Sequence, residues 1–337
     1  MLNTPLCRML GIDLPVFSVG FGQGAGPELA AAVSNAGACG CLGSAGSNAR
    51  RIRELVRAVR AATNRPFGVN AVLHVNREGV IEACLDEGVP LLVLFWGDPK
   101  PWIAEAHRSG TRVFVQVGSV AEAQAAAGAG ADAIIAQGHE AGGHVRGRTA
   151  LTTLIPTVVE AVAPTPVIAA GGIATGRGIV AALSLGAQGV HMGTRFVASE
   201  EADVPLAYKK RVVEASAEDV VYCDDLFDRG WEDAPHRVLR NRIVEEWEAA
   251  GRPASGRRPQ EGVAIGTVIR GAAGHRVQVD RYAPMMLTRD FEGDLEYGPL
   301  WAGESCSLVH DIRPAAEIVS DLVREAEETI VALQSAR

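Results

Sequence analysis

The sequence lacks the features that would place the chain in a membrane or in an oxidising compartment. No apolar run approaches the ~18 residues of a membrane span, and no N-terminal stretch combines a basic start, an apolar core and a small-residue cleavage site. The 6 cysteines are scattered, without a Cys-x-x-Cys pair or a zinc-like spacing with histidines. We therefore expect a cytoplasmic protein with reduced thiols, no membrane contact and no bound metal.

An excess of positive charge is also missing. The 337 residues carry a net charge of -8, which argues against a nucleic acid or an anionic membrane as partner. The arginines gathered between residues 50 and 65 alternate with apolar residues at helical spacing, so a solvated helix face is favoured over a phosphate-backbone patch. Hydrophobic residues, in contrast, make up 47% of the chain, which is enough for a sizeable core.

Strand-like and helix-like segments alternate over the first two thirds of the chain. Short runs rich in Val, Ile or Phe predict eight strands, and the segments between them predict helices, several of which are closed by glycine. Repeated helix-Gly-strand junctions are typical of a parallel sheet, so we predict an α/β fold, a (β/α)8 TIM barrel rather than an open doubly wound sheet. The expected strands are 15–19, 39–43, 67–70, 91–95, 112–117, 133–136, 167–169 and 189–192, and the expected helices include 27–35, 50–62, 77–87, 120–127 and 177–185.

The alternation stops after Thr194, which suggests a division of the chain. We predict a barrel over residues 1–200 and a lid or side subdomain over 201–312, with an exposed polar loop at 251–262. Residues 314–333 carry apolar side chains at helical spacing. A C-terminal helix over 313–337 that packs on the barrel is therefore expected.

Two glycine-rich loops end the seventh and eighth predicted strands. They contain Gly171-Gly172 and Gly193-Thr194. In a βα barrel these loops bind phosphate: glycine allows close approach, Thr194 adds a hydroxyl donor, and the dipole of a helix starting at 174–177 favours negative charge. The alternative is that the glycines serve tight strand-to-helix turns only.

The loop after the sixth predicted strand, residues 137–144, is more specific. Gln137 and the Gly142-Gly143 pair can hydrogen-bond a planar polar ring, and His144 is an acid/base group near neutral pH placed on a loop. We predict a catalytic or substrate-contacting role for His144, with His139 as the substitute. A purely structural histidine is the alternative, and Glu140 is expected to orient the loop.

Other polar and aromatic residues at predicted strand ends are weaker candidates. Asn70 can hydrogen-bond a carbonyl or ring nitrogen of a cofactor, or cap a local turn. Gln116 is a candidate for the same kind of cofactor contact. Phe95-Trp96 either lines a substrate pocket or lies buried under a loop. Trp231 and His236 are candidates for a lid over the site.

Four ordered motifs resemble the nitronate monooxygenase family, formerly called 2-nitropropane dioxygenases. They are the segments 66–70, 137–144, 169–173 and 192–196, and the similarity runs from about residue 10 through 200 and more weakly to 302–316. The resemblance implies an FMN-binding TIM barrel that holds the flavin noncovalently, with His144 as the active-site base. With the loop assignments above, the candidate FMN contacts are Asn70, Gln116, Gln137, Gly142, Gly143, Gly171, Gly172, His191, Met192, Gly193 and Thr194.

The resemblance also implies a reaction. An alkyl nitronate, or a nitroalkane, is oxidised by O2 to a carbonyl compound and nitrite without a nicotinamide reductant. The partners are then a small-molecule substrate and O2, and we allow for a homodimer. The chain departs from the family's pattern at residues 18–21, where the family commonly has Gln-Ala-Pro-Met, and at His191, where it commonly has Gln.

Two alternatives to this function remain. The fold and the Gly-Gly-His loop are also similar to flavin-dependent enoyl-acyl-carrier-protein reductases and NAD(P)H:quinone reductases, although no Gly-x-Gly-x-x-Gly follows a strand. A barrel that binds a phosphate ligand without catalysis is the alternative from a different class.

Overall fold

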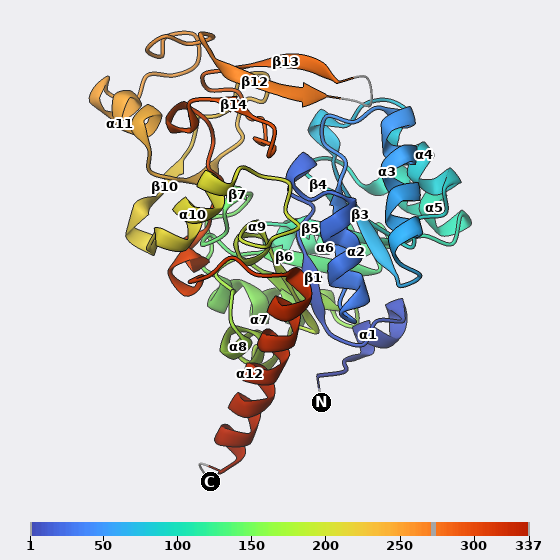
Figure 1. Ribbon diagram of the computed structural model, residues 1–337. Coiled ribbons are helices and arrows are strands. Elements are labelled where there is room, and N and C mark those ends of the chain that lie inside the picture. The colour runs from blue at the N-terminus through green and yellow to red at the C-terminus, as the bar shows by residue number, and fades with distance from the viewer. Residues whose placement is uncertain (1, 271–273, 336–337) are drawn as a thin grey trace.

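A closed barrel of parallel strands forms the centre of the computed structural model, which describes residues 2–270 and 274–335 (Figure 1). Among these residues the main sheet has 8 strands in the order β1-β9-β8-β6-β5-β4-β3-β2. The ring closes between its ends because the amide of Ser18 donates to the carbonyl oxygen of Cys39, and the amide of Cys39 to that of Val16. The strands are β1 (Val16–Ser18), β2 (Gly40–Gly43), β3 (Phe67–Val72), β4 (Leu91–Phe95), β5 (Arg112–Val117), β6 (Ala133–Gln137), β8 (Val167–Ala170) and β9 (Gly189–Met192). The predicted TIM barrel is confirmed.

Helices connect successive strands and surround the barrel, as the alternating sequence pattern requires. Apolar side chains on their inner faces pack against the outward-facing residues of the strands, such as Leu92 and Leu94. The shorter α1 (Pro5–Leu10) places Leu6 and Cys7 in the cluster inside the barrel, and so closes its amino-terminal end. The surrounding helices are α2 (Pro27–Asn35), α3 (Ala49–Ala62), α4 (Val80–Asp86), α5 (Lys100–Arg108), α6 (Val120–Gly128), α7 (Leu151–Val162) and α8 (Gly176–Ser184).

Side chains fill the interior of the barrel. Alternate residues of the strands point inward and form one apolar cluster that includes Phe17, Leu91, Phe114, Ile135 and Ile168. The rings of Phe17 and Phe114 pack edge to face, with centroids 6.0 Å apart. A filled interior leaves the carboxyl ends of the strands as the place where a ligand can bind.

The segment that follows β9 builds a cover over the carboxyl end of the barrel. Its first sheet, in the order β10-β11-β7, includes a strand from the loop after β6, and its second sheet has the order β13-β12-β14 (Figure 1, top). The elements are β7 (Gly143–His144), α9 (Thr194–Val197), α10 (Leu206–Glu214), β10 (Val220–Cys223), β11 (His236–Leu239), α11 (Arg242–Ala249), β12 (Ala264–Arg270), β13 (His275–Asp280) and β14 (Glu292–Gly293).

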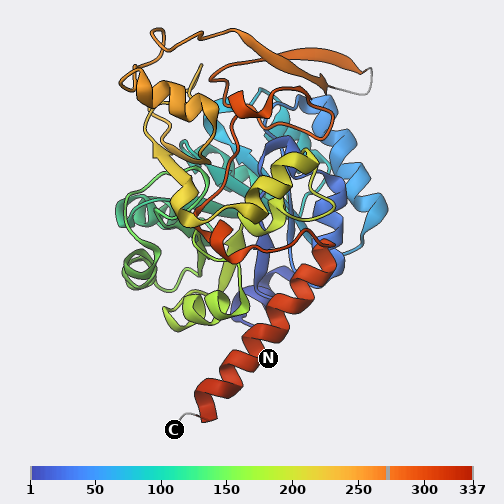
Figure 2. The ribbon, with the colours of Figure 1, turned by 60° about the vertical axis from the view of Figure 1, so that its left-hand side comes forward.

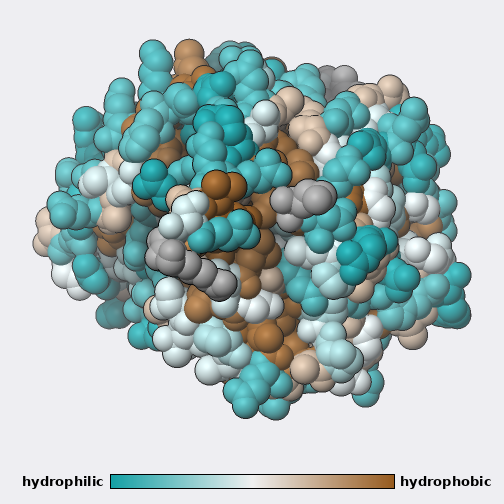
Figure 3. Space-filling view, turned by 90° about the horizontal axis from the view of Figure 1, so that it is seen from below, coloured by the Kyte–Doolittle hydropathy of each residue, from teal (hydrophilic) through white to brown (hydrophobic). Residues whose placement is uncertain are grey.

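The C-terminal helix α12 (Ala315–Ser335) begins against the barrel and ends away from it (Figure 2). Ile318 and Leu322 are buried in the core shared with α8 and α2, whereas Val331 and Leu333 are 61% and 60% exposed. The face seen from below is largely hydrophilic around a central band of apolar side chains (Figure 3). No helix among the described residues is long and apolar enough to cross a membrane.

A substitution at Gly40 tests how tightly α2 packs on the barrel. A Cβ added at Gly40 would lie 2.0 Å from the carbonyl oxygen of Ala30, so Gly40→Ala must displace the α2 backbone. We expect a loss of about 3 kcal/mol in the free energy of unfolding, measured by urea denaturation. Gly128→Ala in α6 is the control: a Cβ there meets no described atom within 4 Å, and the change should be neutral or stabilising by less than about 1 kcal/mol. Equal effects of the two substitutions would contradict this packing.

Candidate active site

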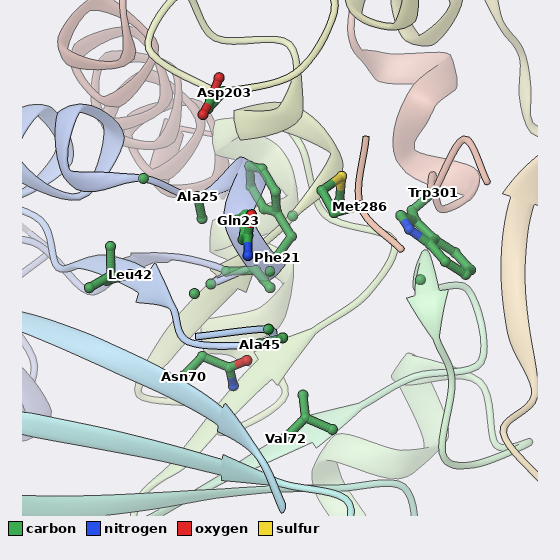
Figure 4. Close-up of a pocket in the computed structure, with 18 of the residues that line it drawn as sticks. Phe21, Gln23, Ala25, Leu42, Ala45, Asn70, Val72, Asp203, Met286 and Trp301 are labelled. Carbon is green, nitrogen blue, oxygen red and sulfur yellow. The ribbon is translucent and has the colours of Figure 1, made fainter. Parts of the chain in front are cut away.

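A cavity of about 1610 Å³ opens at the carboxyl ends of the barrel strands, with Phe21 and Asn70 from the barrel and Met286 and Trp301 from the cover on its walls (Figure 4). Apart from His139, the substitute for His144, every residue proposed from the sequence as catalytic or cofactor-binding lines this cavity. The set is Asn70, Gln116, Gln137, Gly142, Gly143, His144, Gly171, Gly172, His191, Met192, Gly193 and Thr194. The three glycine-rich loops therefore converge.

Backbone geometry at the end of β8 requires glycine. Gly171 and Gly172 have φ angles of 100° and 69°, in the left-handed region that side chains with a Cβ rarely adopt. Both residues lie on the cavity wall, where an exposed backbone can approach a phosphate closely. Next to them, the hydroxyl of Thr194 accepts a hydrogen bond from the amide of Gly303 at 3.0 Å, and its own hydrogen is left to donate. This corner fits an anionic group.

The predicted contribution of the helix that follows β8 is wrong. The side chain of Thr175 accepts from the amide of Gly178, and the carboxylate of Glu325 in α12 accepts from the amide of Gly176 at 2.7 Å. The amino terminus of α8 is thus already occupied by a negative charge from the protein itself. A phosphate at the barrel mouth depends on the glycine loops and Thr194 instead.

His191 forms part of the cavity floor. Its side chain comes from β9 and is 2% exposed, and among the described residues its ring nitrogens have no hydrogen-bond partner other than the Cys41 thiol. At least one nitrogen is therefore left without a partner, which is rare for a buried polar atom, and a polar ligand above the ring would provide one. Cys39 and His191 together lower the pKa of the neighbouring Cys41 thiol to about 6. The floor therefore carries titratable groups where the resembling family has an amide.

Gln137 orients the loop that carries His144. Its side-chain amide nitrogen donates to the carbonyl oxygen of His144 at 2.9 Å, and its oxygen accepts from the amide of Arg146 at 3.0 Å. The Glu140 carboxylate accepts from the amide of Leu151 at the start of α7. Since both ends of the Gln137 side chain bind the loop, we interpret this residue as positioning His144 rather than as a free donor for a cofactor ring.

His144 lies in a box of aromatic rings contributed by the barrel and the cover. It stacks on Trp231 with ring centroids 4.0 Å apart and an interplanar angle of 21°, and it meets Trp301 at 5.2 Å and Trp96 at 5.9 Å. Its Nε2 atom has no partner among the described residues. Burial, reinforced by the neighbouring His236 and His74, lowers the pKa of His144 well below its ordinary value of 6.5. The pKa is therefore shifted below the neutral range expected from the sequence, which favours the neutral ring, and that ring can accept a proton.

The substitute base does not share this environment. The ring of His139 packs against Tyr222 at 4.6 Å, and its Nδ1 lies 3.4 Å from the carbonyl oxygen of Gly147. His139 is not part of the cavity wall, although it belongs to the same loop as His144. The structure therefore separates the two histidines.

Two residues that complete the site were missed from the sequence. Arg237 is 5% exposed and donates to the carbonyl oxygens of His139 and Ala141, which fixes the loop before His144. Trp301 forms one wall of the aromatic box. The only local signal for Arg237 is a charged residue inside a buried strand, and Trp301 has no local signal.

Comparisons with known proteins identify the family of the chain. The family described as nitronate monooxygenase matches residues 3–80 and 73–325. The chain is 35% identical to a (3aS,4S,5R,7aS)-5-hydroxy-7a-methyl-1-oxo-octahydro-1H-indene-4-carboxyl-CoA dehydrogenase of Mycobacterium tuberculosis, with 96% of each chain covered. It is 30% identical to a nitronate monooxygenase of Paraburkholderia phytofirmans, covering 98% of this chain and 96% of that one. The solved structure of FabK from Thermotoga maritima superposes with a TM-score of 0.81 at 33% identity, over 100% of both chains.

The titration of His144 tests the aromatic box. In isotope-labelled protein, the His144 ring signal, assigned by its loss in His144→Ala, should remain that of a neutral imidazole well below pH 6.5, because burial lowers its pKa. Trp231→Ala admits water to the ring and should move the midpoint up toward 6.5. Trp102→Ala, in α5, is the control and should leave the midpoint in place. A wild-type midpoint at 6.5, or no shift in Trp231→Ala, would contradict the box.

Proposed function

The chain belongs to the nitronate monooxygenase family of oxidoreductases, and on this premise we propose that it oxidises alkyl nitronates or nitroalkanes with O2, using FMN. The products are a carbonyl compound and nitrite. The observation that carries the proposal is a neutral, unpartnered His144 beside a cavity whose wall holds glycine loops suited to a phosphate. Flavin dependence comes with the family, and FMN as the particular flavin belongs to the proposal.

The residues at the barrel mouth suit a flavin mononucleotide. Gly172, Gly193 and Thr194 would hold the phosphate, and Asn70 and His191 would contact the ring system. His191 supports this because its ring has no hydrogen-bond partner other than the Cys41 thiol within the described chain. When bound, FMN supplies the electron chemistry, accepting an electron pair that the protein's own side chains cannot take.

His144 is assigned the proton chemistry. Its neutral Nε2 removes the α-proton of a nitroalkane, and the resulting imidazolium stabilises the negative charge of the nitronate. Trp96, Trp231 and Trp301 pack around the ring and reduce its contact with water, which strengthens this charge interaction. Gln137 and Arg237 keep the loop in place while the proton moves.

Removal of the base should separate catalysis from cofactor binding. We expect His144→Ala to retain bound FMN, because the proposed phosphate and ring contacts lie elsewhere, and to lose about 10²- to 10⁴-fold in turnover of neutral 1-nitropropane, whose α-proton must be removed, measured by nitrite release. His139→Ala is the matched control and should keep most activity, since His139 is outside the cavity. Full activity of His144→Ala would assign the base to another residue.

The size of the cavity favours a second candidate function. At about 1610 Å³ it exceeds the usual range of roughly 300–1,000 Å³ for small-molecule sites, and a flavin with a small nitronate does not require that volume. The 35% identical relative is named a CoA dehydrogenase. Flavin-dependent oxidation or reduction of a coenzyme A-type thioester, with His144 exchanging the proton beside the carbonyl, is therefore the alternative.

Anaerobic mixing with NADPH distinguishes the two functions. If the chain is a nitronate oxidase, the flavin absorbance should persist on the time scale of turnover, because this reaction needs no nicotinamide. Rapid bleaching that an enoyl thioester reverses would favour the thioester enzyme and count against the oxidase. An anaerobic mixture with propyl nitronate is the positive control for flavin reduction.

A further inference from the structure

The cavity extends from the barrel mouth toward the start of α3, where no catalytic or flavin role has been assigned. Ser47, Asn48, Arg50 and Arg51 at the start of α3, with Arg77 from the loop before α4, form one wall of this outer arm. Thr288, from the cover, also lines the cavity. These residues are separate from the glycine loops that suit the flavin phosphate.

The start of α3 offers hydrogen-bond donors without acceptors. α3 has 14 residues, and the first amides of a helix have no acceptor within the helix. Asn48 caps the amide of Arg51 at 2.9 Å. Ser47 is 3% exposed and its hydroxyl has no partner among the described residues, and the same holds for Thr288, also 3% exposed. Two buried hydroxyls of the cavity lining, one at the start of α3 and one in the cover, thus lack the hydrogen bonds that buried polar groups normally make.

Positive charge in the outer arm is not neutralised locally. Arg50 and Arg51 share one carboxylate, that of Glu54, at 3.6 Å and 3.2 Å, and Arg77 has no ion pair within the described chain. The carboxylates on the cavity wall already have partners.

The carboxylates that line the cavity are bound by other groups of the protein. Glu28 and Asp203 bind Arg289 at 3.2 Å and 2.7 Å, Asp290 accepts from the amide of Ile269, and Glu201 accepts from the amide of Ala315. The α3 side of the arm carries Arg50, Arg51 and Arg77 against the single carboxylate of Glu54 and is therefore cationic, in a chain whose net charge is -8.

We propose that this arm binds the pyrophosphate of a cosubstrate that contains adenosine diphosphate, a coenzyme A thioester or a nicotinamide dinucleotide. Arginines and a helix amino terminus are the groups that bind phosphates most effectively, and the buried Ser47 hydroxyl adds a donor at the start of α3. The phosphates occupy the arm while the reactive end of the ligand extends to His144. This inference rests on the proposed flavin site at the barrel mouth and on the second candidate function, the thioester enzyme, whose second ligand it specifies.

Charge removal at the arm tests the proposal. With full-length, FMN-loaded protein, titration calorimetry measures the binding of coenzyme A and of NADP⁺, with adenosine as a probe that lacks phosphate. The double variant Arg50→Gln/Arg51→Gln and the single variant Arg77→Gln should each weaken the binding of at least one phosphate ligand by about tenfold or more, and the wild-type affinity should fall as salt is added. Arg108→Gln, an exposed arginine of α5 outside the cavity, removes the same charge and should change affinity by less than about twofold.

The two ligands identify the source of the pyrophosphate. Weakened binding of coenzyme A assigns the arm to a thioester, and weakened binding of NADP⁺ assigns it to a nicotinamide dinucleotide. The proposal is overturned if neither ligand binds, or if the arm variants bind like the wild type while their thermal unfolding shows that they are folded.

The flavin site is judged separately by the colour of the protein. A yellow protein that binds neither ligand removes the arm proposal and leaves the proposed function standing. A colourless protein that binds coenzyme A or NADP⁺ at the arm removes the proposed function instead.

Discussion

The pairing of β7 with β11 is the contact on which the rest of the site depends. His144 lies opposite His236 in this short antiparallel ladder, and the amide of Val145 continues it to the carbonyl oxygen of Pro235 at 2.8 Å. The ladder joins a barrel loop to the cover, so the position of the proposed base depends on both. Arg237, the neighbour of His236, secures the same loop through the carbonyl oxygens of His139 and Ala141. Because side chains fill the interior of the barrel, a ligand can bind and react only at its mouth, and this ladder shapes the mouth.

Enclosure of two adjacent imidazoles determines the electrostatics of the site. Burial lowers the pKa of His236 to about 4 and moves that of His144 in the same direction, while the Nε2 of His236 accepts from the amide of Phe227 at 3.1 Å. A charged imidazolium is disfavoured in this apolar box until a negative charge is beside it. Proton transfer from a substrate that becomes an anion provides that charge. The site is therefore suited to a reaction that creates the ion pair in one step, and poorly suited to holding a permanent cation.

The sequence predicts the local elements of the fold and misses the contacts between residues that are far apart in the chain. Helix-Gly-strand junctions are short-range signals, so all eight barrel strands were placed within one or two residues, and the rule that parallel strands end at one rim brought the glycine loops together. Two contacts depend on the tertiary fold and could not be predicted. The Gln137 side chain binds its own loop, and Glu325 binds the amino terminus of α8. Trp301 reaches His144 from more than 150 residues away, and no periodic pattern encodes such a contact. The pKa of His144 was misjudged for the same reason, because its burial is contributed mainly by the cover.

The central claim is that the glycine-lined mouth of the barrel holds FMN next to a neutral histidine. The most direct measurement is the visible absorption spectrum of the purified chain, followed by identification and quantification of any flavin released on denaturation. The account predicts the bands of an oxidised flavin and the release of FMN in an amount equal to that of the protein. A colourless protein that takes up no FMN on reconstitution would contradict it.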